Sequence, residues 1–472
     1  MQRECEFLVV GGGIAGVSCA ESLAICRPTA SILLLTESSI VKSVTNLVPV
    51  ARYLHKFDVR EQDVSEMGAT IETLVDQLDH INSREHSIRT KNGVVIKYRY
   101  LCLCTGGAPK LFSGSGIEPH IIGIRDTDSV VELQRKLATA KDVLILGNGG
   151  IASELAYELK DVNVHWVVKD AHISATFVDP GAAEFFQLAR SEVNAKDSSP
   201  ETAIKRMRYG ELLPREQNNK QGAALGPDWH SSFDLSGASG AGDRRLPKIY
   251  YKSHIDWHQE LPNGAGLRIQ LGHEDGSSEQ LNCDFIVSAT GVLPRHDYSS
   301  DSPLKYSEDG GISVDEMMRT NLEDVYAAGD VCTASWSPAM HWFQMRLWTQ
   351  ARQMGSMAGR SMAAASENET VYQDFCFELF GHVTKLFGYP VVLLGRFNGQ
   401  DLGKDYEILV RCTRNKEYIK FVLQNGRLRG AILIGNSDLA ETCENLILNG
   451  IDLEPYGDDI LNPDIDIEDY FD

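Results

Sequence analysis

The chain has 472 residues, with 66 acidic against 45 basic side chains and a formal charge of −21. This length exceeds what a single hydrophobic core serves, so several domains are expected. The acidic balance argues against broad binding to nucleic acid or anionic membrane, no apolar run is long enough to span a membrane, and the charged start is unlike a cleavable leader.

A dinucleotide-binding unit is predicted at the start of the chain. An apolar run at residues 5–10 leads into a glycine-rich turn and an alanine-rich helical pattern, and a second strand at residues 31–35 precedes an acid. In this arrangement the glycines permit a tight turn and close approach to a pyrophosphate, while the acid accepts hydrogen bonds from ribose hydroxyls. The cofactor contacts expected here are Gly11, Gly12, Gly13, Ile14, Ala15, Gly16 and Glu37.

The same pattern recurs 136 residues later. A strand at residues 142–146 leads into a G-x-G-x-x-A loop, a helix and a strand at residues 164–168, so a second dinucleotide site is expected. After that strand, Lys169 suits the 2′-phosphate of NADPH and Asp170 suits the 2′-hydroxyl of NADH, which leaves both reductants open. The expected contacts are Gly147, Gly149, Gly150, Ile151, Ala152, Lys169 and Asp170.

Three further strands are expected to end where the chain crosses close to a cofactor. They cover residues 101–104, 284–288 and 324–328, and small residues follow the first two. An aspartate follows the third, at the carboxyl end of a strand where ligands bind in such sheets. The contacts expected at these ends are Thr105, Gly106, Ala289, Thr290, Gly291, Gly329, Asp330 and Val331.

The remaining segments are an insertion, a C-terminal domain and a tail. Residues 189–247 are rich in Ser, Gly, Asn and Gln and predict either a disordered loop or a docking element, with residues 225–230 least like a linker. Strands are predicted at residues 391–394, 407–411, 418–423 and 428–434, and a helix at 438–448. Residues 452–472 hold nine acidic side chains among apolar ones, such as Ile460 and Leu461, and form either a solvated terminus or a docking segment.

The order of these motifs resembles the pyridine nucleotide-disulfide oxidoreductase superfamily over residues 5–360. The resemblance implies an α/β fold with two Rossmann-like βαβ domains, FAD in the first and NADH or NADPH in the second, the second inserted in the first. A C-terminal α+β domain follows, and Asp330 is implied to reach the ribityl chain and phosphates of FAD. The expected boundaries are 1–123 and 285–365 for the FAD domain, 124–284 for the NAD(P)H domain, 366–451 for the C-terminal domain and 452–472 for the acidic tail.

The redox disulfide of this superfamily is missing. Disulfide reductases place C-x-x-x-x-C after the first ribose-binding acid, whereas residues 38–46 contain no cysteine. By resemblance, Lys42 stands where the superfamily keeps a lysine over the flavin, and Glu154 occupies the position of its usual partner. We therefore expect Lys42 and Glu154 to form a catalytic ion pair beside the flavin; the alternative is a surface lysine and a helix-face glutamate.

A long helix is expected to start within residues 342–351 and to point its N-terminus at the flavin pyrimidine, where negative charge accumulates on reduction. Trp348, Thr349 and Gln350 are the contacts expected there. Trp336 and Trp342, together with Trp348, either shield the flavin ring or pack in the core.

The ten cysteines lack C-x-x-C spacing, which predicts reduced thiols, no metal site and a cytoplasmic or nuclear protein. The expected function is an FAD-dependent NAD(P)H oxidoreductase; a fast NAD(P)H oxidase or quinone reductase is the alternative. A closer resemblance within the superfamily rests on residues 37–46, 224–230, 345–354 and 464–472. It implies association with the metal-dependent tRNA-splicing ligase complex, which the flavoprotein protects from oxidative inactivation, without sequence-specific binding to nucleic acid or a membrane.

Overall fold

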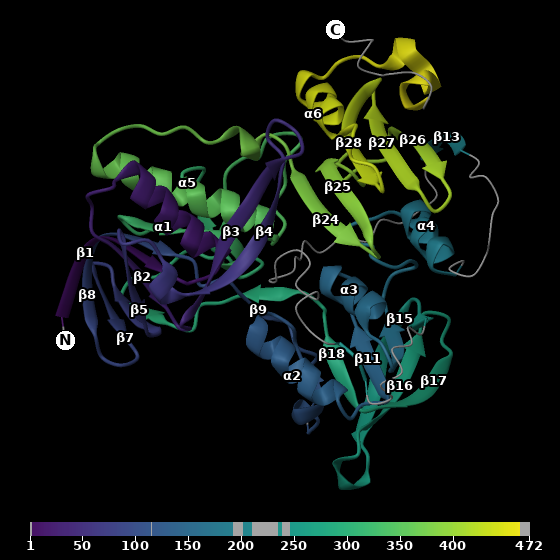
Figure 1. Ribbon diagram of the computed structural model, residues 1–472, viewed down its shortest axis with the longest axis horizontal. Coiled ribbons are helices and arrows are strands. Elements are labelled where there is room, and N and C mark those ends of the chain that lie inside the picture. Colours follow the sequence, from purple (N-terminus) through teal and green to yellow (C-terminus); the bar gives the residue numbers. More distant parts are fainter. Residues whose placement is uncertain (1, 115, 192–201, 210–234, 238–245, 463–472) are drawn as a thin grey trace. The chain divides into compact units, whose positions relative to one another are not determined.

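The computed structural model describes residues 2–114, 116–191, 202–209, 235–237 and 246–462. These residues form two units, each interrupted in the sequence by the other (Figure 1). Unit 1 comprises Met1–Pro49, His55–Ala108 and Val292–Glu378; unit 2 comprises Val50–Leu54, Pro109–Gly291 and Leu379–Asp472. The expected insertion of a second nucleotide-binding domain within the first is therefore confirmed.

Unit 1 is built on an eight-stranded sheet in the order β20-β6-β7-β8-β1-β2-β5, with β22 also paired to β8. Strands β8, β1, β2 and β5 run parallel, with β5 at one edge of the sheet. The apolar residues of β1 and β2, inside the sheet, are buried, as expected for parallel strands covered on both faces. Helices α1 and α5 lie side by side over this sheet (Figure 1), and they approach closely because Gly355 of α5 faces the carbonyl of Ala15.

The elements of unit 1 are β1 (Gln2–Val10), α1 (Ile14–Cys26), β2 (Ile32–Thr36), β3 (Ile40–Pro49), β4 (His55–Asp63), β5 (Ile71–Val75), β6 (Leu78–Asn82), β7 (Ser87–Thr90), β8 (Val95–Leu103), β9 (Gly107–Pro109, which runs into unit 2), β19 (Val292–Pro294), β20 (Ser299–Ser300), β21 (Ile312–Val314), β22 (Val325–Ala327), β23 (Cys332–Ala334) and α5 (Trp348–Ser366).

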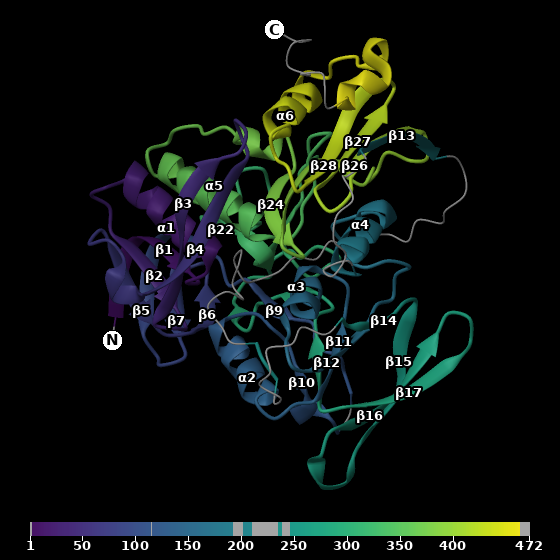
Figure 2. The same ribbon diagram turned by 45° about the vertical axis from the view of Figure 1, so that its right-hand side comes forward.

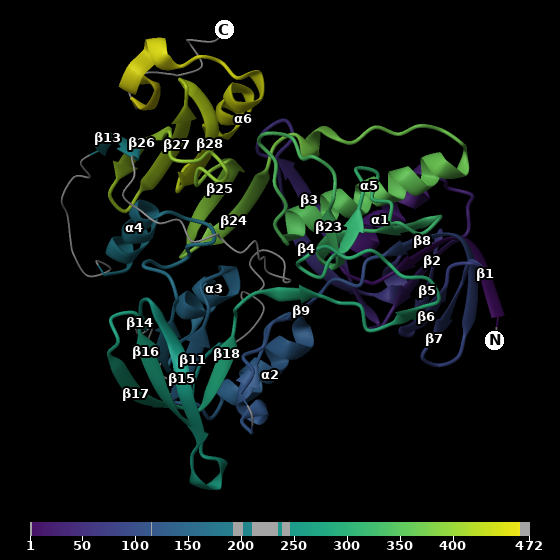
Figure 3. The same ribbon diagram turned by 180° about the vertical axis from the view of Figure 1, so that it is seen from behind.

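Unit 2 contains a five-stranded parallel sheet in the order β10-β18-β11-β12-β14. Helices α2 and α3 lie beside it, with α2 next to β18 (Figure 3). A separate antiparallel sheet, β15-β16-β17, lies between β14 and β18 in the sequence. This part of unit 2 is the second βαβ unit that the glycine pattern predicts.

The C-terminal domain of unit 2 is a six-stranded antiparallel sheet, β13-β26-β27-β28-β25-β24, covered by helix α6. The predicted strands and helix of this domain are confirmed, with β24 in addition. Strand β13 comes from the expected insertion and pairs with β26 along its whole length (Figure 2). Disorder is therefore wrong for residues 202–209, which dock on the sheet; residues 225–230 lie outside the described residues.

The elements of unit 2 are β10 (Ile121–Ile122), α2 (Thr127–Leu137), β11 (Asp142–Leu146), α3 (Gly150–Glu158), β12 (Asn163–Val167), α4 (Pro180–Ser191), β13 (Thr202–Tyr209), β14 (Lys248–Tyr250), β15 (Ser253–Glu260), β16 (Leu267–His273), β17 (Ser278–Cys283), β18 (Phe285–Ser288), β24 (Gly381–Leu386), β25 (Tyr389–Gly395), β26 (Tyr406–Thr413), β27 (Glu417–Gln424), β28 (Arg427–Ile434) and α6 (Ala440–Asn449).

The first part of the acidic tail is folded. Leu453, Ile460 and Leu461 are buried in the core of the C-terminal domain, and Asp452 pairs with Arg427 across a β-bridge. Ile460 and Leu461 are core residues, which corrects their expected place in an exposed terminus, because their apolar side chains are covered by the domain itself. Residues 463–472 of the expected tail lie outside the described residues.

Candidate cofactor site

The first glycine loop joins β1 to α1 in unit 1. Gly11 has a φ of 122°, and a Cβ there would collide with the carbonyl oxygen of Cys104, so only glycine fits. Around Gly13, by contrast, an added Cβ would meet nothing within 4 Å among the described residues. Gly13 also caps α1 without a side-chain hydrogen bond, which leaves backbone N–H groups of the first helical turn to an anion.

The second loop repeats this geometry in unit 2. Gly147 has a φ of 131°, and its Cβ would collide with the carbonyl oxygen of Ala289, just as Gly11 faces Cys104. Gly149 has the same open surroundings as Gly13 in the described part of the chain, and it begins α3 without a side-chain cap. Both loops therefore offer an open cradle and an uncapped helix N-terminus, which fit the pyrophosphate of a dinucleotide.

A threonine and a glycine follow the strand that faces each glycine loop. In unit 1 the hydroxyl of Thr105 donates to the carbonyl of Arg295, and Gly106 has a φ of 71°. In unit 2 the hydroxyl of Thr290 donates to the carbonyl of Lys110 at 2.8 Å, and Gly291 has a φ of 110°. The predicted threonine–glycine pairs therefore occupy equivalent places in the two units.

Glu37 follows β2, as the ribose-binding assignment requires. Its carboxylate is held by the guanidinium of Arg295, with Nη2 at 2.8 Å from Oε2, and by the amide of Gln77 at 3.1 Å. The hydrogen bond with Glu37 raises the pKa of Arg295. Sequence reasoning missed Arg295, although it lies seven residues after the end of the strand predicted at residues 284–288 to cross near the cofactor.

Lys42 lies on β3, beside the first glycine loop. Its backbone N–H donates to the carbonyl of Gly12 at 2.9 Å, so the strand is fixed directly to the glycine loop. Its ammonium lies 3.7 Å from Glu61, the residue that faces it across the β3–β4 pair. Glu154 is buried on α3 of unit 2. The expected pair would join the two units, and it stays a prediction.

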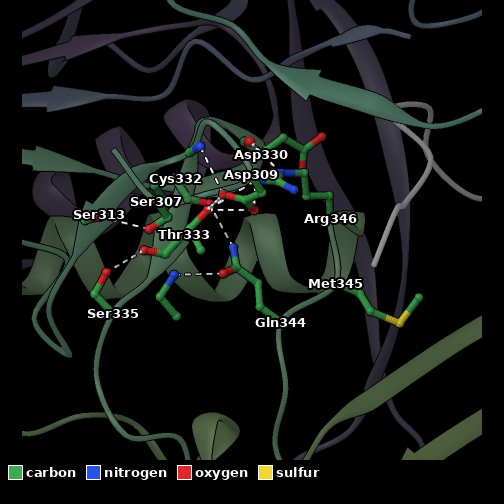
Figure 4. Close-up of polar contacts among 12 residues, drawn as sticks. Ser307, Asp309, Ser313, Asp330, Cys332, Thr333, Ser335, Gln344, Met345 and Arg346 are labelled. Atoms are coloured by element: carbon green, nitrogen blue, oxygen red, sulfur yellow. Dashed lines mark hydrogen bonds and ion pairs between the residues drawn. The ribbon is translucent and has the colours of Figure 1, made fainter. Parts of the chain in front are cut away.

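Asp330 lies in a single 3₁₀ turn, Gly329–Val331, after β22. The Nε of Arg346 donates to its carbonyl at 2.9 Å, and an Nη2 of the same guanidinium donates to Asp309 at 2.7 Å (Figure 4). Burial alone would raise the pKa of Asp309, but hydrogen bonds from Arg346 and Thr333 outweigh it and hold the pKa below its usual range. Buried Arg346 therefore fixes the backbone that presents the Asp330 side chain.

The long helix begins at Trp348, six residues later than the first residue of the expected segment. Residues 342–347 are not helical, because the amide of Gln350 binds the backbone of both Phe343 and Met345 at 2.8 Å. Gln344 similarly binds the backbone of β23 (Figure 4). The expected contacts Trp348, Thr349 and Gln350 are buried in the first turn, whose N-cap Leu347 supplies no side-chain hydrogen bond.

The three tryptophans differ in their surroundings, which bears on whether each shields the flavin ring or packs in the core. Trp336 and Trp342 stack on each other with ring centroids 5.4 Å apart and pack in the core of unit 1, which favours a packing role for both. Trp348, at the start of α5, stays a candidate for the flavin ring.

In the second unit, Asp170 and Lys169 differ in their surroundings. The side-chain amide of Asn148, in the glycine loop, donates to the carboxylate of Asp170 at 2.8 Å. Lys169 is exposed. The structure thus holds the acid, rather than the cation, against the loop.

The cysteines near the first loop are buried. The sulfur atoms of Cys102 and Cys104 lie 3.5 Å apart beside buried Cys19. Hydrogen bonds with Cys104 and Cys19, together with burial, raise the pKa of Cys102 well above its usual value, which opposes thiolate chemistry. All ten cysteines are free, and no cluster of His, Cys, Asp or Glu within the described residues could hold a metal ion.

The two loops and their strands define a protein that binds two dinucleotides. A family model described as pyridine nucleotide-disulphide oxidoreductase matches residues 6–197 and 258–355, and one for the rubredoxin NAD+ reductase C-terminal domain matches residues 382–451. The chain belongs to the pyridine nucleotide-disulphide oxidoreductase family, and it uses FAD and a nicotinamide reductant.

Individual relatives share the whole length. The chain is 84% identical over 472 residues to pyridine nucleotide-disulfide oxidoreductase domain-containing protein 1 of Drosophila melanogaster, with 100% of both chains covered. It is 45% identical to the Homo sapiens protein of that name, covering 99% of this chain and 98% of the relative. A ferredoxin reductase from Rhodopseudomonas palustris has the same fold, with a TM-score of 0.67 at 17% identity, covering 98% of this chain and 99% of that one. In the described residues, no helix is both long and apolar enough to cross a membrane.

Proposed function

We propose that this chain oxidises NAD(P)H through FAD without a redox disulfide. The observation that carries the proposal is strand β3, which occupies the stretch after the ribose-binding acid, contains Lys42 in place of a cysteine pair, and is hydrogen-bonded to Gly12. FAD supplies the acceptor for the hydride of the nicotinamide. The proposed place of the Lys42 ammonium is beside the flavin ring, where its charge stabilises the negative charge that the flavin gains on reduction.

The test is flavin reduction by NADH in anaerobic stopped flow. We expect Lys42→Met to slow reduction and to lower the flavin midpoint potential, because the reduced form loses a stabilising charge. Lys42→Arg is the matched control, since it keeps the charge. An unchanged rate and potential in Lys42→Met would contradict the assignment. Glu154→Gln tests the expected partner by the same two measurements.

The proposed reductant is NADH rather than NADPH. Asp170 supports this choice, because Asn148 holds its carboxylate at the loop where it can accept ribose hydroxyls, whereas a 2′-phosphate would be repelled there. Flavin reduction by each nucleotide under identical conditions measures the preference. Faster reduction by NADPH would refute this choice.

We further propose a protective role with slow turnover, in which the loaded flavoprotein guards the tRNA-splicing ligase complex in cytoplasm and nucleus. The support is the missing redox disulfide together with the closer resemblance described above. The lifetime of the reduced flavin in air distinguishes the roles: a persistent complex of NAD+ with reduced flavin favours protection, and rapid reoxidation with steady turnover favours an NAD(P)H oxidase or quinone reductase.

The contact with the ligase is proposed to involve the terminal acidic residues. Because Ile460 and Leu461 belong to the core, a deletion should begin at residue 463, so that the C-terminal domain keeps its packing. Loss of ligase binding on deletion of residues 463–472, with unchanged thermal stability, is expected. Full ligase affinity after this deletion would exclude the tail from the contact.

A further inference from the structure

Arg295 lies across the acid that is assigned to the ribose of FAD. Its Nη1 and Nη2 both donate to the carboxylate of Glu37, and its Nε donates to Asp297 at 2.7 Å. The backbone is fixed as well, because its N–H donates to the carbonyl of Gly106 at 2.9 Å and its carbonyl accepts from Thr105. Arg295 is thus held at both backbone and side chain beside the first glycine loop.

We propose that Arg295 is a positioning residue for the adenosine end of FAD, because it holds the carboxylate of Glu37 while that carboxylate accepts hydrogen bonds from the ribose hydroxyls. The proposal rests on the placement of FAD at the first glycine loop and adds to that site a cation that its motif does not contain. The chemical class it serves is an adenosine diphosphate moiety whose ribose has free hydroxyls.

The hydrogen-bond capacity of Glu37 indicates that Arg295 stays bound to it when FAD binds. A carboxylate has about four acceptor positions. Oε2 takes Nη2 of Arg295 and the amide of Gln77, and Oε1 takes Nη1 of Arg295, so among the described residues one position is left. A ribose with two hydroxyls needs two positions, so one present donor has to leave. The neutral amide of Gln77, at 3.1 Å, is held more weakly than the bidentate guanidinium, so Gln77 turns away and Arg295 stays.

The charges of Glu37 and of the FAD pyrophosphate also favour a bound Arg295. FAD carries a negative pyrophosphate, and an unpaired Glu37 would add a second negative charge near it. Arg295 neutralises Glu37, whose side chain is 38% exposed, so this interaction is less screened than that with Asp297, whose side chain is 75% exposed. The pair therefore keeps an acceptor for the ribose while removing repulsion of the phosphates.

The test is titration of the full-length apoprotein with FAD, followed by quenching of flavin fluorescence. Arg295→Met is expected to raise the Kd for FAD about tenfold through loss of a charge-assisted contact. Arg295→Lys should give a smaller increase, because an ammonium keeps the charge but not the fork. Gln77→Ala is the matched control, and it should leave the Kd unchanged or lower it.

The sign of the change decides the result. An unchanged or lower Kd in Arg295→Met would overturn the proposal, since Arg295 would then compete with the ribose. A Gln77→Ala variant that weakens binding as much as Arg295→Met would also overturn it. If Arg295→Met fails to fold, wild-type affinity in Arg295→Lys counts against the proposal and weaker affinity supports it. Gly11→Ala distinguishes a failure of the FAD site from a failure of the role of Arg295. FAD binding retained in Gly11→Ala would contradict the FAD site itself. FAD binding lost in Gly11→Ala but unaffected in Arg295→Met would contradict only the role of Arg295.

Discussion

The buried ion pair of Lys420 with Asp179 makes a quantitative prediction about unit 2. Lys420, on β27, is 1% exposed, and its Nζ lies 2.6 Å from Oδ2 of Asp179 and 2.8 Å from Oδ1 of Asn398. Asp179 precedes α4, and its other oxygen accepts from the N–H of Gly181 at 2.9 Å and from the hydroxyl of Tyr418 at 3.1 Å. The pair thus joins α4 of the nucleotide-binding part to the C-terminal sheet within unit 2.

Replacing Lys420 by Met leaves a buried carboxylate without its cation, a loss that typically costs 3–5 kcal/mol, and about 3 kcal/mol is expected here because one oxygen keeps its hydrogen bonds. Adding Asp179→Asn to Lys420→Met removes the unpaired charge, so the double variant should be more stable than the single one. Chemical denaturation of the FAD-loaded protein at neutral pH measures both values. A Lys420→Met variant within about 0.5 kcal/mol of wild type would refute this reasoning.

The pH dependence of the pair follows from Asp179. Burial alone would raise its pKa, but the charge and hydrogen bond of Lys420, with the hydroxyl of Tyr418, hold the pKa below its usual value. The unfolded state therefore binds a proton first, so the contribution of the pair is present above about pH 4 and is lost as the pH falls through the lower folded-state value. In Lys420→Met the pKa should rise, and the difference from wild type should shrink in acid.

Three further predictions follow from the site and the core. Gly11→Ala should abolish FAD binding, whereas Gly147→Ala should abolish flavin reduction by NADH while FAD is retained, because each Cβ would collide with a backbone carbonyl; fluorescence titration and stopped flow check the two. Burial lowers the pKa of His382 to about 3, so the unfolded state alone binds its proton below about pH 6.5, and stability falls by about 1.4 kcal/mol per pH unit in that range. Urea unfolding at pH 5 and 7 should show this slope reduced in His382→Phe. Arg346→Met should weaken FAD retention through the freed backbone at Asp330, and dialysis followed by flavin absorbance measures the loss.

The sequence predicts the two nucleotide-binding folds because each depends on residues that lie close together in the sequence. Gly11 and Gly147 are needed where a strand turns into a helix against a carbonyl, and the acid lies at the end of the next strand. Arg295 escapes such reasoning, because its contact with Glu37 joins residues 258 apart in sequence and depends on how a strand returns to the sheet. A lone arginine after a proline has no local signal of this kind.

The C-terminal domain shows the same division. The apolar runs at residues 418–423 and 428–434, with the turn residues Asn425 and Gly426 between them, predict the β27–β28 hairpin, since these signals are local. Strand β13 could not be predicted as part of this sheet: residues 202–209 lie in a polar insertion, and they pair with β26 about two hundred residues later. The late start of α5 is similar, because side-chain amides of Gln344 and Gln350 hold residues 342–347 out of a helix that their pattern favours.

The conformation of β3 explains why the missing disulfide is more than a change of residue type. A C-x-x-x-x-C pair can close on a helix, but residues five apart on a strand are separated by about 17 Å. A disulfide requires Cα atoms within about 7 Å. Residues 40–49 form a strand paired to β4 and anchored by the Lys42 N–H at Gly12, so this stretch cannot bring two such sulfurs together. We therefore expect the double variant Ile40→Cys with Thr45→Cys to titrate two more free thiols than the wild-type chain, which has ten, after mild oxidation and unfolding. A disulfide between residues 40 and 45 would show that β3 opens into a helix, and the case for flavin chemistry without a dithiol would then rest only on the missing cysteines.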